Sequence, residues 1–201
     1  MMTPGGVPVT RVLILGDTHL PAWGQLPAEL CHEAATADLV VHTGDFASVD
    51  VYQELAGVSR LYAVRGNRDA EELESLLPAM QRFALAGIPV VLVHGDEWGR
   101  PRPSRLAREF GHLARVVIYG HLHKPYVEEL GNCLVINPGS PTVPRSSPAS
   151  YITADFAQDR VEVTVRSVGG GRLDERLFPV AGGVSGDAGD GPGGRTGEQR
   201  G

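Results

Sequence analysis

The chain has 201 residues, of which 42% are hydrophobic and 21% are charged, and this composition is typical of a soluble globular protein with one core. Its formal net charge of −6 argues against a general nucleic-acid or membrane binder, so we expect neither stable nucleic-acid binding nor membrane association. No apolar run approaches the roughly 20 residues of a transmembrane helix, and the first residues lack the pattern of a signal peptide.

The ends of the chain differ in composition from its middle. Residues 1–8 are rich in proline and glycine, and we expect a flexible N-terminus there. Residues 181–201 are rich in glycine and hold one large aliphatic residue, so we expect a disordered tail. The folded domain is therefore predicted to span residues 9–180. Its two cysteines, Cys31 and Cys133, lie in unrelated contexts and predict free thiols in a reducing cytoplasm.

Strands and helices alternate through the first two thirds of the folded domain. In chain order we expect a strand at 9–15, a helix at 26–36, a strand at 38–43, a helix at 48–57, a strand at 60–64, a helix at 70–77, strands at 80–86 and 88–94, a helix at 103–111, a strand at 115–119, and then strands and turns at 126–137, 150–156 and 160–168. Ser48 is a plausible N-cap of the second helix, and Gly57 a plausible end. This order predicts an α/β fold, a four-layer αββα sandwich of two mixed β-sheets flanked by helices.

Five of the predicted strands end in the same way, with a glycine beside a carboxylate, an amide or an imidazole. The five endings are Gly16-Asp17-Thr18-His19, Gly44-Asp45, Gly66-Asn67-Arg68, His94-Gly95-Asp96 and Gly120-His121-Leu122-His123. Because the carboxyl ends of strands in an open α/β sheet meet at one crevice, we expect these side chains to gather there.

The gathered side chains form a set that needs a cation. The set is Asp17, His19, Asp45, Asn67, His94, His121 and His123. Close carboxylates without a counter-ion would repel each other at a cost of several kcal/mol. Imidazole nitrogen with carboxylate oxygen suits Mn, Fe, Zn, Co or Ni. Seven ligands are too many for one ion that must also bind a substrate, and they suit two ions that share a bridging carboxylate.

Each ending also has an ordinary structural interpretation when it is taken alone. Gly-Asp and Gly-Asn are common in turns, and His-Gly is nearly uninformative. The pair His121 and His123 is the most specific single motif, and the hypothesis depends on all five in series. The other three histidines, His32, His42 and His112, lack this context, and we interpret them as structural or surface residues.

The five motifs together resemble those of the calcineurin-like metallophosphoesterase superfamily over roughly residues 11–168. The loop Asn137-Pro138-Gly139-Ser140 is similar to that of its small single-domain phosphodiesterase branch in bacteria and archaea, which includes the phosphoesterase-fold subunit of retromer. The resemblance implies a first divalent ion held by Asp17, His19, Asp45 and His123, with Asp45 bridging to a second ion held by Asn67, His94 and His121. It implies manganese as the common metal of this branch, with Fe, Zn, Ni and Co as alternatives.

The resemblance also implies a reaction, in which a hydroxide that bridges two ions attacks phosphorus in a small phosphodiester or nucleotide-like substrate. We expect Asn67, Arg68 and His94 to act in catalysis. Arg68 stands where many relatives have His or Cys, and because arginine stays protonated it can stabilise phosphoryl charge but is a poor general acid. Asp96 stands where relatives often have a second His, and it could repel substrate or orient a ligand.

The sequence leaves several points open. Residues 97–105 form a plausible loop over the site, where Trp98 could stack on a ring and Arg100, Arg102 and Arg105 could meet phosphate, or they are a solvated loop with a half-buried Trp. A dinucleotide polyphosphate hydrolase, a nuclease and a monoesterase are not separated from a diesterase. The alternatives to an enzyme are a non-catalytic metal-binding scaffold or protein-interaction module, and a regulatory module that binds nucleotide. A homo-oligomer could form through a sheet edge.

Overall fold

The computed structural model describes residues 8–180, so the predictions for residues 1–7 and 181–201 lie outside the described residues. One sheet contains β11 (Gly171–Pro179), β10 (Arg160–Ser167), β9 (Ser150–Ala157), β1 (Thr10–Leu15), β2 (Leu39–His42) and β3 (Leu61–Ala63), in that order. The other contains β4 (Met80–Leu85), β5 (Ile88–Val93), β6 (Val116–Ile118), β8 (Cys133–Pro138) and β7 (Pro125–Leu130). The helices are α1 (Ala28–Thr36), α2 (Val49–Val58), α3 (Glu71–Leu76) and α4 (Pro103–Phe110), with short 3₁₀ turns η1 (Trp23–Gln25) and η2 (Asp96–Trp98).

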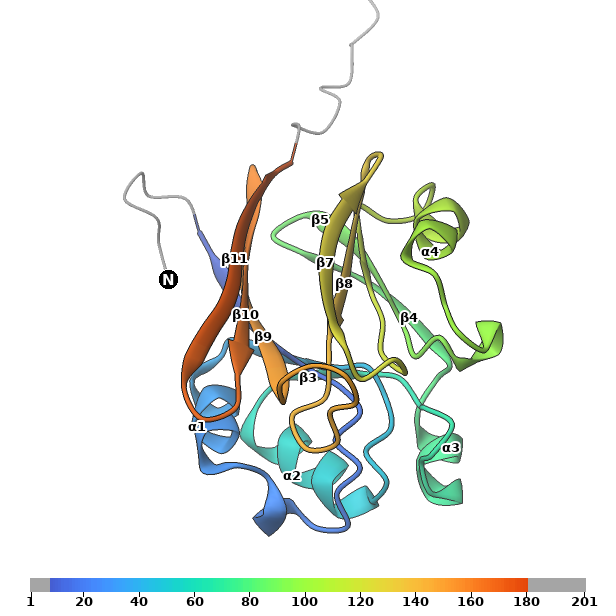
Figure 1. Ribbon diagram of the computed structural model, residues 1–201, viewed down its shortest axis with the longest axis vertical. Coiled ribbons are helices and arrows are strands. Elements are labelled where there is room, and N and C mark those ends of the chain that lie inside the picture. The colour runs from blue at the N-terminus through green and yellow to red at the C-terminus, as the bar shows by residue number, and fades with distance from the viewer. Residues whose placement is uncertain (1–7, 181–201) are drawn as a thin grey trace, which may run out of the picture.

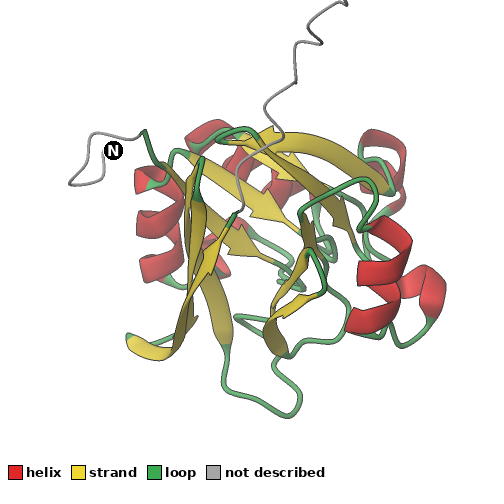
Figure 2. Ribbon diagram, turned by 90° about the horizontal axis from the view of Figure 1, so that it is seen from above, coloured by secondary structure: helices red, strands yellow, loops and turns green. Residues whose placement is uncertain are grey.

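Both sheets are mixed, which confirms the predicted fold class. In the first sheet β1, β2 and β3 are parallel and β9 runs antiparallel to β1. In the second sheet β5, β6 and β8 are parallel, while β4 and β7 run antiparallel to their neighbours. Figures 1 and 2 show the two sheets facing each other, with α1 and α2 outside the first and α4 outside the second.

Alternation along the strands explains the layers, because successive side chains of a strand point to opposite faces. In β1, Val12 and Ile14 belong to the core between the sheets, whereas Leu13 and Leu15 pack with residues of α1 and α2. In β6, Ile118 faces the other sheet and Val117 packs with residues of α4. Central strands are thus buried on both faces.

The predicted elements agree with the structure to within one or two residues at their ends, and one strand is an addition. Ser48 caps α2, since its Oγ accepts a hydrogen bond of 3.5 Å from the N–H of Val51. The helix runs one residue past Gly57, however, and α1 begins at Ala28 rather than at 26. Strand β11 was not expected, because all its residues but Phe178 lie at least partly open to solvent and its sequence lacks apolar alternation. Among residues 8–180, no helix combines the length and the apolar character needed to cross a bilayer.

Candidate metal centre

The structure brings all seven candidate ligands together where the central strands of the two sheets end. Asp17 and His19 follow β1, Asp45 follows β2, and Asn67 follows β3, all from the first sheet. His94 follows β5, and His121 and His123 follow β6, from the second sheet. The cluster therefore lies at the meeting of the two sheets, and each sheet contributes several of its side chains.

A first group of ligands surrounds one point. Asp17, His19, Asp45 and His123 each offer one ligand atom, and these atoms all lie within 4.8 Å of one another. His123 Nε2 is 3.2 Å from Asp17 Oδ1, and His19 Nε2 is 3.4 Å from Asp45 Oδ2. Two carboxylates and two imidazoles thus face a single small volume.

A second group adjoins the first through Asp45. Asp45 Oδ2 is 3.6 Å from His94 Nε2, so the same oxygen lies near an imidazole of each group. Asn67 Oδ1 is 3.2 Å from His94 Nε2 and 3.1 Å from His121 Nδ1. Asn67, His94 and His121 therefore form a second group of donor side chains next to Asp45.

Burial and charge show that this donor set fits divalent cations. Asp17 and Asp45 are 0% and 2% exposed, and within residues 8–180 neither forms an ion pair with Lys or Arg. Buried carboxylates without a cation are costly. The Nε2 atoms of His19 and His123 face each other at 3.2 Å, where a metal ligand pair would converge. Oxygen and imidazole nitrogen in this mixture suit Mn, Fe, Zn, Co or Ni.

Two of the histidines are held in the tautomer that metal binding requires. His94 Nδ1 donates to the carbonyl of Thr43 at 2.8 Å, and His123 Nδ1 donates to the carbonyl of Val143 at 2.6 Å. A carbonyl oxygen only accepts, so Nδ1 carries the proton in both rings. The lone pair is then on Nε2, which in each ring points into the cluster.

Asp69 organises the loops that carry the ligands, and sequence reasoning missed it. Its carboxylate accepts hydrogen bonds from four backbone N–H groups, those of Asp45 (3.2 Å), Phe46 (2.6 Å), Ala47 (3.1 Å) and Gly66 (2.7 Å). Burial raises the pKa of Asp69, while these N–H groups oppose that shift. Asp69 thus ties the loop after β2 to the loop after β3. The sequence signal that points to Asp69 is its position two residues after Asn67.

The loop after β8 supports the first ligand loop in a similar way. Ser140 Oγ donates to the carbonyl of Asp17 at 2.7 Å, and Thr142 Oγ1 donates to the carbonyl of Thr18. Asn137 Nδ2 donates to the carbonyl of Gly120 at 2.8 Å. The end of β8, through Asn137, and the loop after it, through Ser140 and Thr142, therefore contact the loops after β6 and β1 and link the ligands of the two sheets.

The backbone of the ligand loops is strained. Five of the seven candidate ligands have positive φ, namely Asp17 (51°), His19 (47°), Asp45 (58°), His121 (68°) and His123 (54°). Such values are uncommon for residues other than glycine and cost about 1–3 kcal/mol each. Gly66 is required for another reason, because a Cβ there would lie 2.2 Å from Asp45 Oδ1. The fold thus accepts unfavourable conformations in order to aim these side chains inward.

The environment shifts the pKa values of the histidines in different directions. Burial lowers the pKa of His19, although the charge of Asp45 opposes this. Burial also disfavours protonation of His123, but the hydrogen bond and charge of Asp17 outweigh it, so its pKa is raised. His42, which lies under the cluster and stacks on Phe46 with ring centroids 3.5 Å apart, has its pKa well below the usual value because it is fully buried.

A hollow of about 300 Å³ opens over the cluster. It is lined by His19, Asp45, Asn67, Arg68, His121, His123, Val143 and Arg145. Arg68 is exposed and lines this hollow, and Arg145, which the sequence motifs do not include, also lines it. Asp96 lies in η2 and does not line the hollow.

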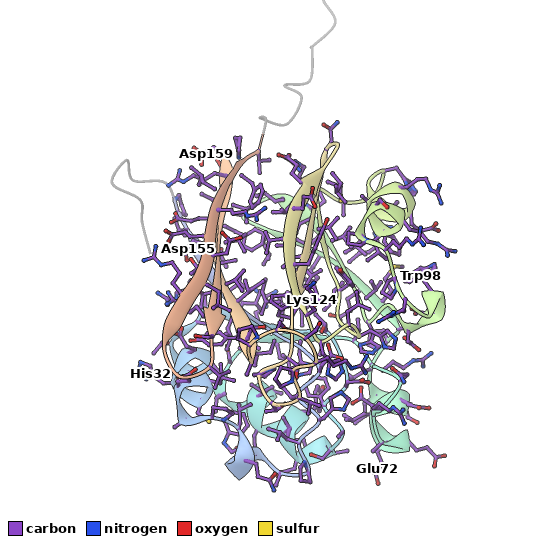
Figure 3. The ribbon with its side chains drawn as sticks, viewed as in Figure 1. His32, Glu72, Trp98, Lys124, Asp155 and Asp159 are labelled. Atoms are coloured by element: carbon purple, nitrogen blue, oxygen red, sulfur yellow. The ribbon has the colours of Figure 1, made fainter. Side chains whose placement is uncertain are left out.

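Residues 97–105 do not place their tryptophan over the cluster. Trp98 packs edge-on against Phe110 of α4, with ring centroids 5.8 Å apart, and is half-buried. Figure 3 shows it beside α4, on the outer side of the second sheet. The geometry agrees with the interpretation of a half-buried Trp and not with stacking on a ring in the metal site. His32 lies on α1, away from the cluster (Figure 3).

The comparisons with known proteins agree with this arrangement. A protein-family model described as "Calcineurin-like phosphoesterase superfamily domain" matches residues 10–159. The chain belongs to the calcineurin-like phosphoesterase superfamily. This confirms the resemblance found in the sequence.

Two curated relatives are named as phosphoesterases. A protein of Methanothermobacter thermautotrophicus named "Probable metallophosphoesterase" is 30% identical over 161 residues, which cover 78% of this chain and 91% of the relative. "Phosphodiesterase YfcE" of Escherichia coli K12 is 33% identical over 113 residues, 53% of this chain and 59% of the relative. Its solved structure has a TM-score of 0.59 at 25% identity and covers 83% of this chain and 98% of that one.

Vacuolar Protein Sorting 29 from Cryptosporidium parvum has the same fold. Its structure has a TM-score of 0.73 at 23% identity, and it covers 85% of this chain and 97% of that one. At this identity the likeness concerns the fold alone. Proteins named as phosphoesterases and a protein named for protein sorting thus share one fold, so function must be argued from the residues of the site.

Proposed function

We propose that this protein hydrolyses small phosphodiesters at a centre of two divalent cations that share the carboxylate of Asp45. The observation that carries the proposal is the position of Asp45 Oδ2, 3.4 Å from His19 Nε2 and 3.6 Å from His94 Nε2. One buried oxygen therefore faces two donor sets. A site for a single ion would not need the second set.

The residues divide between the two cation sites as follows. Asp17, His19, Asp45 and His123 would hold one ion, and Asp45, Asn67, His94 and His121 would hold the other. When bound, such a pair of ions supplies a water of lowered pKa and positive charge for the phosphoryl oxygens. Mn²⁺ is our first choice, and Fe, Zn, Ni and Co accept the same donors.

The chain's own residues orient the substrate. Arg68 and Arg145 are exposed on the rim of the hollow and can donate paired hydrogen bonds to phosphoryl oxygens. A guanidinium group is a hydrogen-bond donor and a poor general acid, so Arg68 would stabilise phosphoryl charge and not protonate the leaving oxygen. We therefore expect preference for esters whose leaving group departs as a stable anion. Asn67 Oδ1 and His94 Nε2 lie 3.2 Å apart, where both lone pairs would donate to the second ion.

The comparisons favour a diesterase over a scaffold. The E. coli relative that is 33% identical over 113 residues is named a phosphodiesterase. In this chain every one of the seven ligand positions carries a side chain that can donate to a metal. A scaffold that binds no metal would need none of them, and nothing would then offset the cost of burying Asp17 and Asp45. A metal-binding scaffold is separated from an enzyme by the test of turnover.

The test is hydrolysis by protein that has been stripped of metal and then supplied with Mn²⁺. Bis-p-nitrophenyl phosphate would be compared with p-nitrophenyl phosphate, and Asp45→Asn would be the matched variant. We expect Mn²⁺-dependent turnover of the diester, lost in Asp45→Asn. Turnover of the monoester alone would make the protein a phosphatase, and absence of turnover with two ions bound would favour the scaffold.

A further inference from the structure

A second hollow lies beside the one over the metal centre. It has a volume of about 430 Å³, and its charged lining residues are Arg100, Arg102, Lys124 and Arg145. Arg145 lines both hollows. The metal hollow and this basic hollow are therefore neighbours that share one cationic side chain.

The wall between the two hollows is the loop that follows β6. His121 and His123 line the metal hollow, whereas Leu122 between them lines the basic hollow. Lys124, the next residue, also lines the basic hollow and lies directly before β7 (Figure 3). Groups bound on the two sides would thus be separated by this loop, with Arg145 in reach of both hollows.

The charge of the basic hollow is of one sign. No acidic residue is among those that line it, and in residues 8–180 none of its four cations forms an ion pair within 4 Å. By contrast, Arg115, Arg160 and Arg172 each pair with a carboxylate elsewhere on the surface. Four unpaired cations around one hollow, in a chain of net charge −6, form a local positive field that attracts anions.

Other features of the lining limit what can bind there. Pro101 and Pro103 flank Arg102, and the fixed φ of proline limits the freedom of this segment before any ligand arrives. Pro103 also begins the eight-residue helix α4, whose positive end adds to the field of the side chains. Arg105 lines neither hollow, so only part of the arginine-rich segment contributes.

We propose that the basic hollow binds a second phosphate of the substrate, so that the preferred substrate is a small polyphosphate ester, such as a nucleotide with linked phosphates. This rests on the proposed function, since the reacting phosphate would lie in the metal hollow. Arg145 would contact both phosphates, and Arg100, Arg102 and Lys124 would contact the second one. Charge-assisted hydrogen bonds of arginine to phosphate give such a site its affinity.

The test measures binding by calorimetry on the full chain loaded with Mn²⁺. The probes are AMP, with one phosphorus, and its non-hydrolysable α,β-methylene diphosphate analogue, with two. We expect the analogue to bind at least about tenfold more tightly than AMP, as one or two charge-assisted hydrogen bonds would give. In the variant Arg100→Gln/Arg102→Gln this ratio should fall toward one. The matched control is Arg105→Gln/Arg108→Gln, which removes equal charge from α4 and should keep the ratio.

The outcomes are distinguishable from failure of the proposed function. Equal affinities in the wild-type protein, or equal loss of the ratio in both double variants, would overturn the second-phosphate site. Tighter binding of a single-stranded tetranucleotide than of the diphosphate analogue, with the same sensitivity to Arg100→Gln/Arg102→Gln, would replace the small polyphosphate by a nucleic-acid strand. Absence of bis-p-nitrophenyl phosphate turnover in the wild-type protein would overturn the phosphodiesterase alone, because the binding ratio is measured without turnover.

Discussion

In β1, Val12 to Leu15 are fully buried and apolar, and two residues later Asp17 is equally buried and carries a carboxyl group. The same change occurs between Val41 of β2 and Asp45. The strand bodies have regular backbone and pair in register, whereas the loops after them place Asp and His at positive φ. The buried strand bodies lower the free energy of the folded state, whereas the strand ends, with buried carboxylates and positive φ, raise it. The comparison teaches that the strand bodies stabilise the protein while the strand ends use part of that stability to form a site.

The largest effect should come from Asp45→Asn at a strand end. Removing the shared charge should lower Mn²⁺-dependent hydrolysis by about 10³-fold or more, which corresponds to about 4 kcal/mol of transition-state stabilisation. Asn keeps an oxygen that can accept from the Arg68 N–H, now 2.7 Å from Oδ1. We therefore expect the metal-free protein to become more stable to urea, by about 1–2 kcal/mol. Loss of stability together with activity would contradict the division between the two regions.

The reciprocal change is Ile118→Ala in the body of β6. Ile118 is 0% exposed in the core between the sheets, so the truncation should lower the free energy of unfolding by about 2–5 kcal/mol. Urea denaturation measures this loss. The folded fraction should keep the wild-type kcat, and a large fall in kcat at unchanged stability would show that the strand bodies also tune the site.

Asp69→Asn tests the connection between the ligand loops. Asn keeps one oxygen acceptor but loses the charge that attracts four N–H groups, so we expect a loss of about 1–3 kcal/mol in unfolding free energy. Because Asp45 and Gly66 lie on the two loops that Asp69 joins, Mn²⁺ affinity should fall as well. Unchanged affinity, measured by calorimetry, would limit Asp69 to a role in folding.

His42 should make the metal-free protein sensitive to acid. Its pKa is well below 6.5 in the folded state because of burial, and near 6.5 in the unfolded chain. Below pH 6.5 the unfolded state binds one more proton at this residue, so stability falls with acidification by about 1.4 kcal/mol per pH unit. His42→Asn should remove this part of the slope between pH 6.5 and 5. An identical slope in both proteins would assign the acid sensitivity to other histidines.

The smallest effect is expected from His121→Gly. His121 has φ of 68°, which glycine adopts without strain, so the metal-free protein should gain about 1 kcal/mol in unfolding free energy. The matched control is Leu122→Gly, at a neighbouring residue without positive φ, which should not stabilise. Equal effects in both variants would mean that the strain of the ligand loops is not stored at His121.

The sequence predicts the strand bodies and their ends well because both depend on local pattern. Apolar runs such as Val12 to Leu15 define strands, and a glycine beside Asp, Asn or His marks the five ligand-bearing turns. Strand β11 is missed because pairing with β10, at Val161 and Phe178 among others, orders a segment that is polar by itself. Such a strand forms because of its tertiary contacts, which a local sequence pattern does not indicate.

Within the site, contacts made through the backbone are the part that sequence does not show. Asp69 acts by accepting N–H bonds from residues up to 24 positions away, so its side chain type alone says little. Arg145 enters both hollows because the loop after β8 returns to the ligand loops through Ser140. The sequence allows Trp98 either to stack on a ring at the site or to be a half-buried residue of a loop, and its packing on Phe110 supports the second role.

The most direct test of the shared carboxylate is a Mn²⁺ titration followed by electron paramagnetic resonance. Two Mn²⁺ ions should bind to each wild-type chain and give the broad spectrum of a magnetically coupled pair. In His121→Ala, which removes a ligand from one side of Asp45 only, one ion should bind with the six-line spectrum of isolated Mn²⁺. A single ion in the wild-type protein, or two ions without coupling, would contradict a centre in which Asp45 serves both cations.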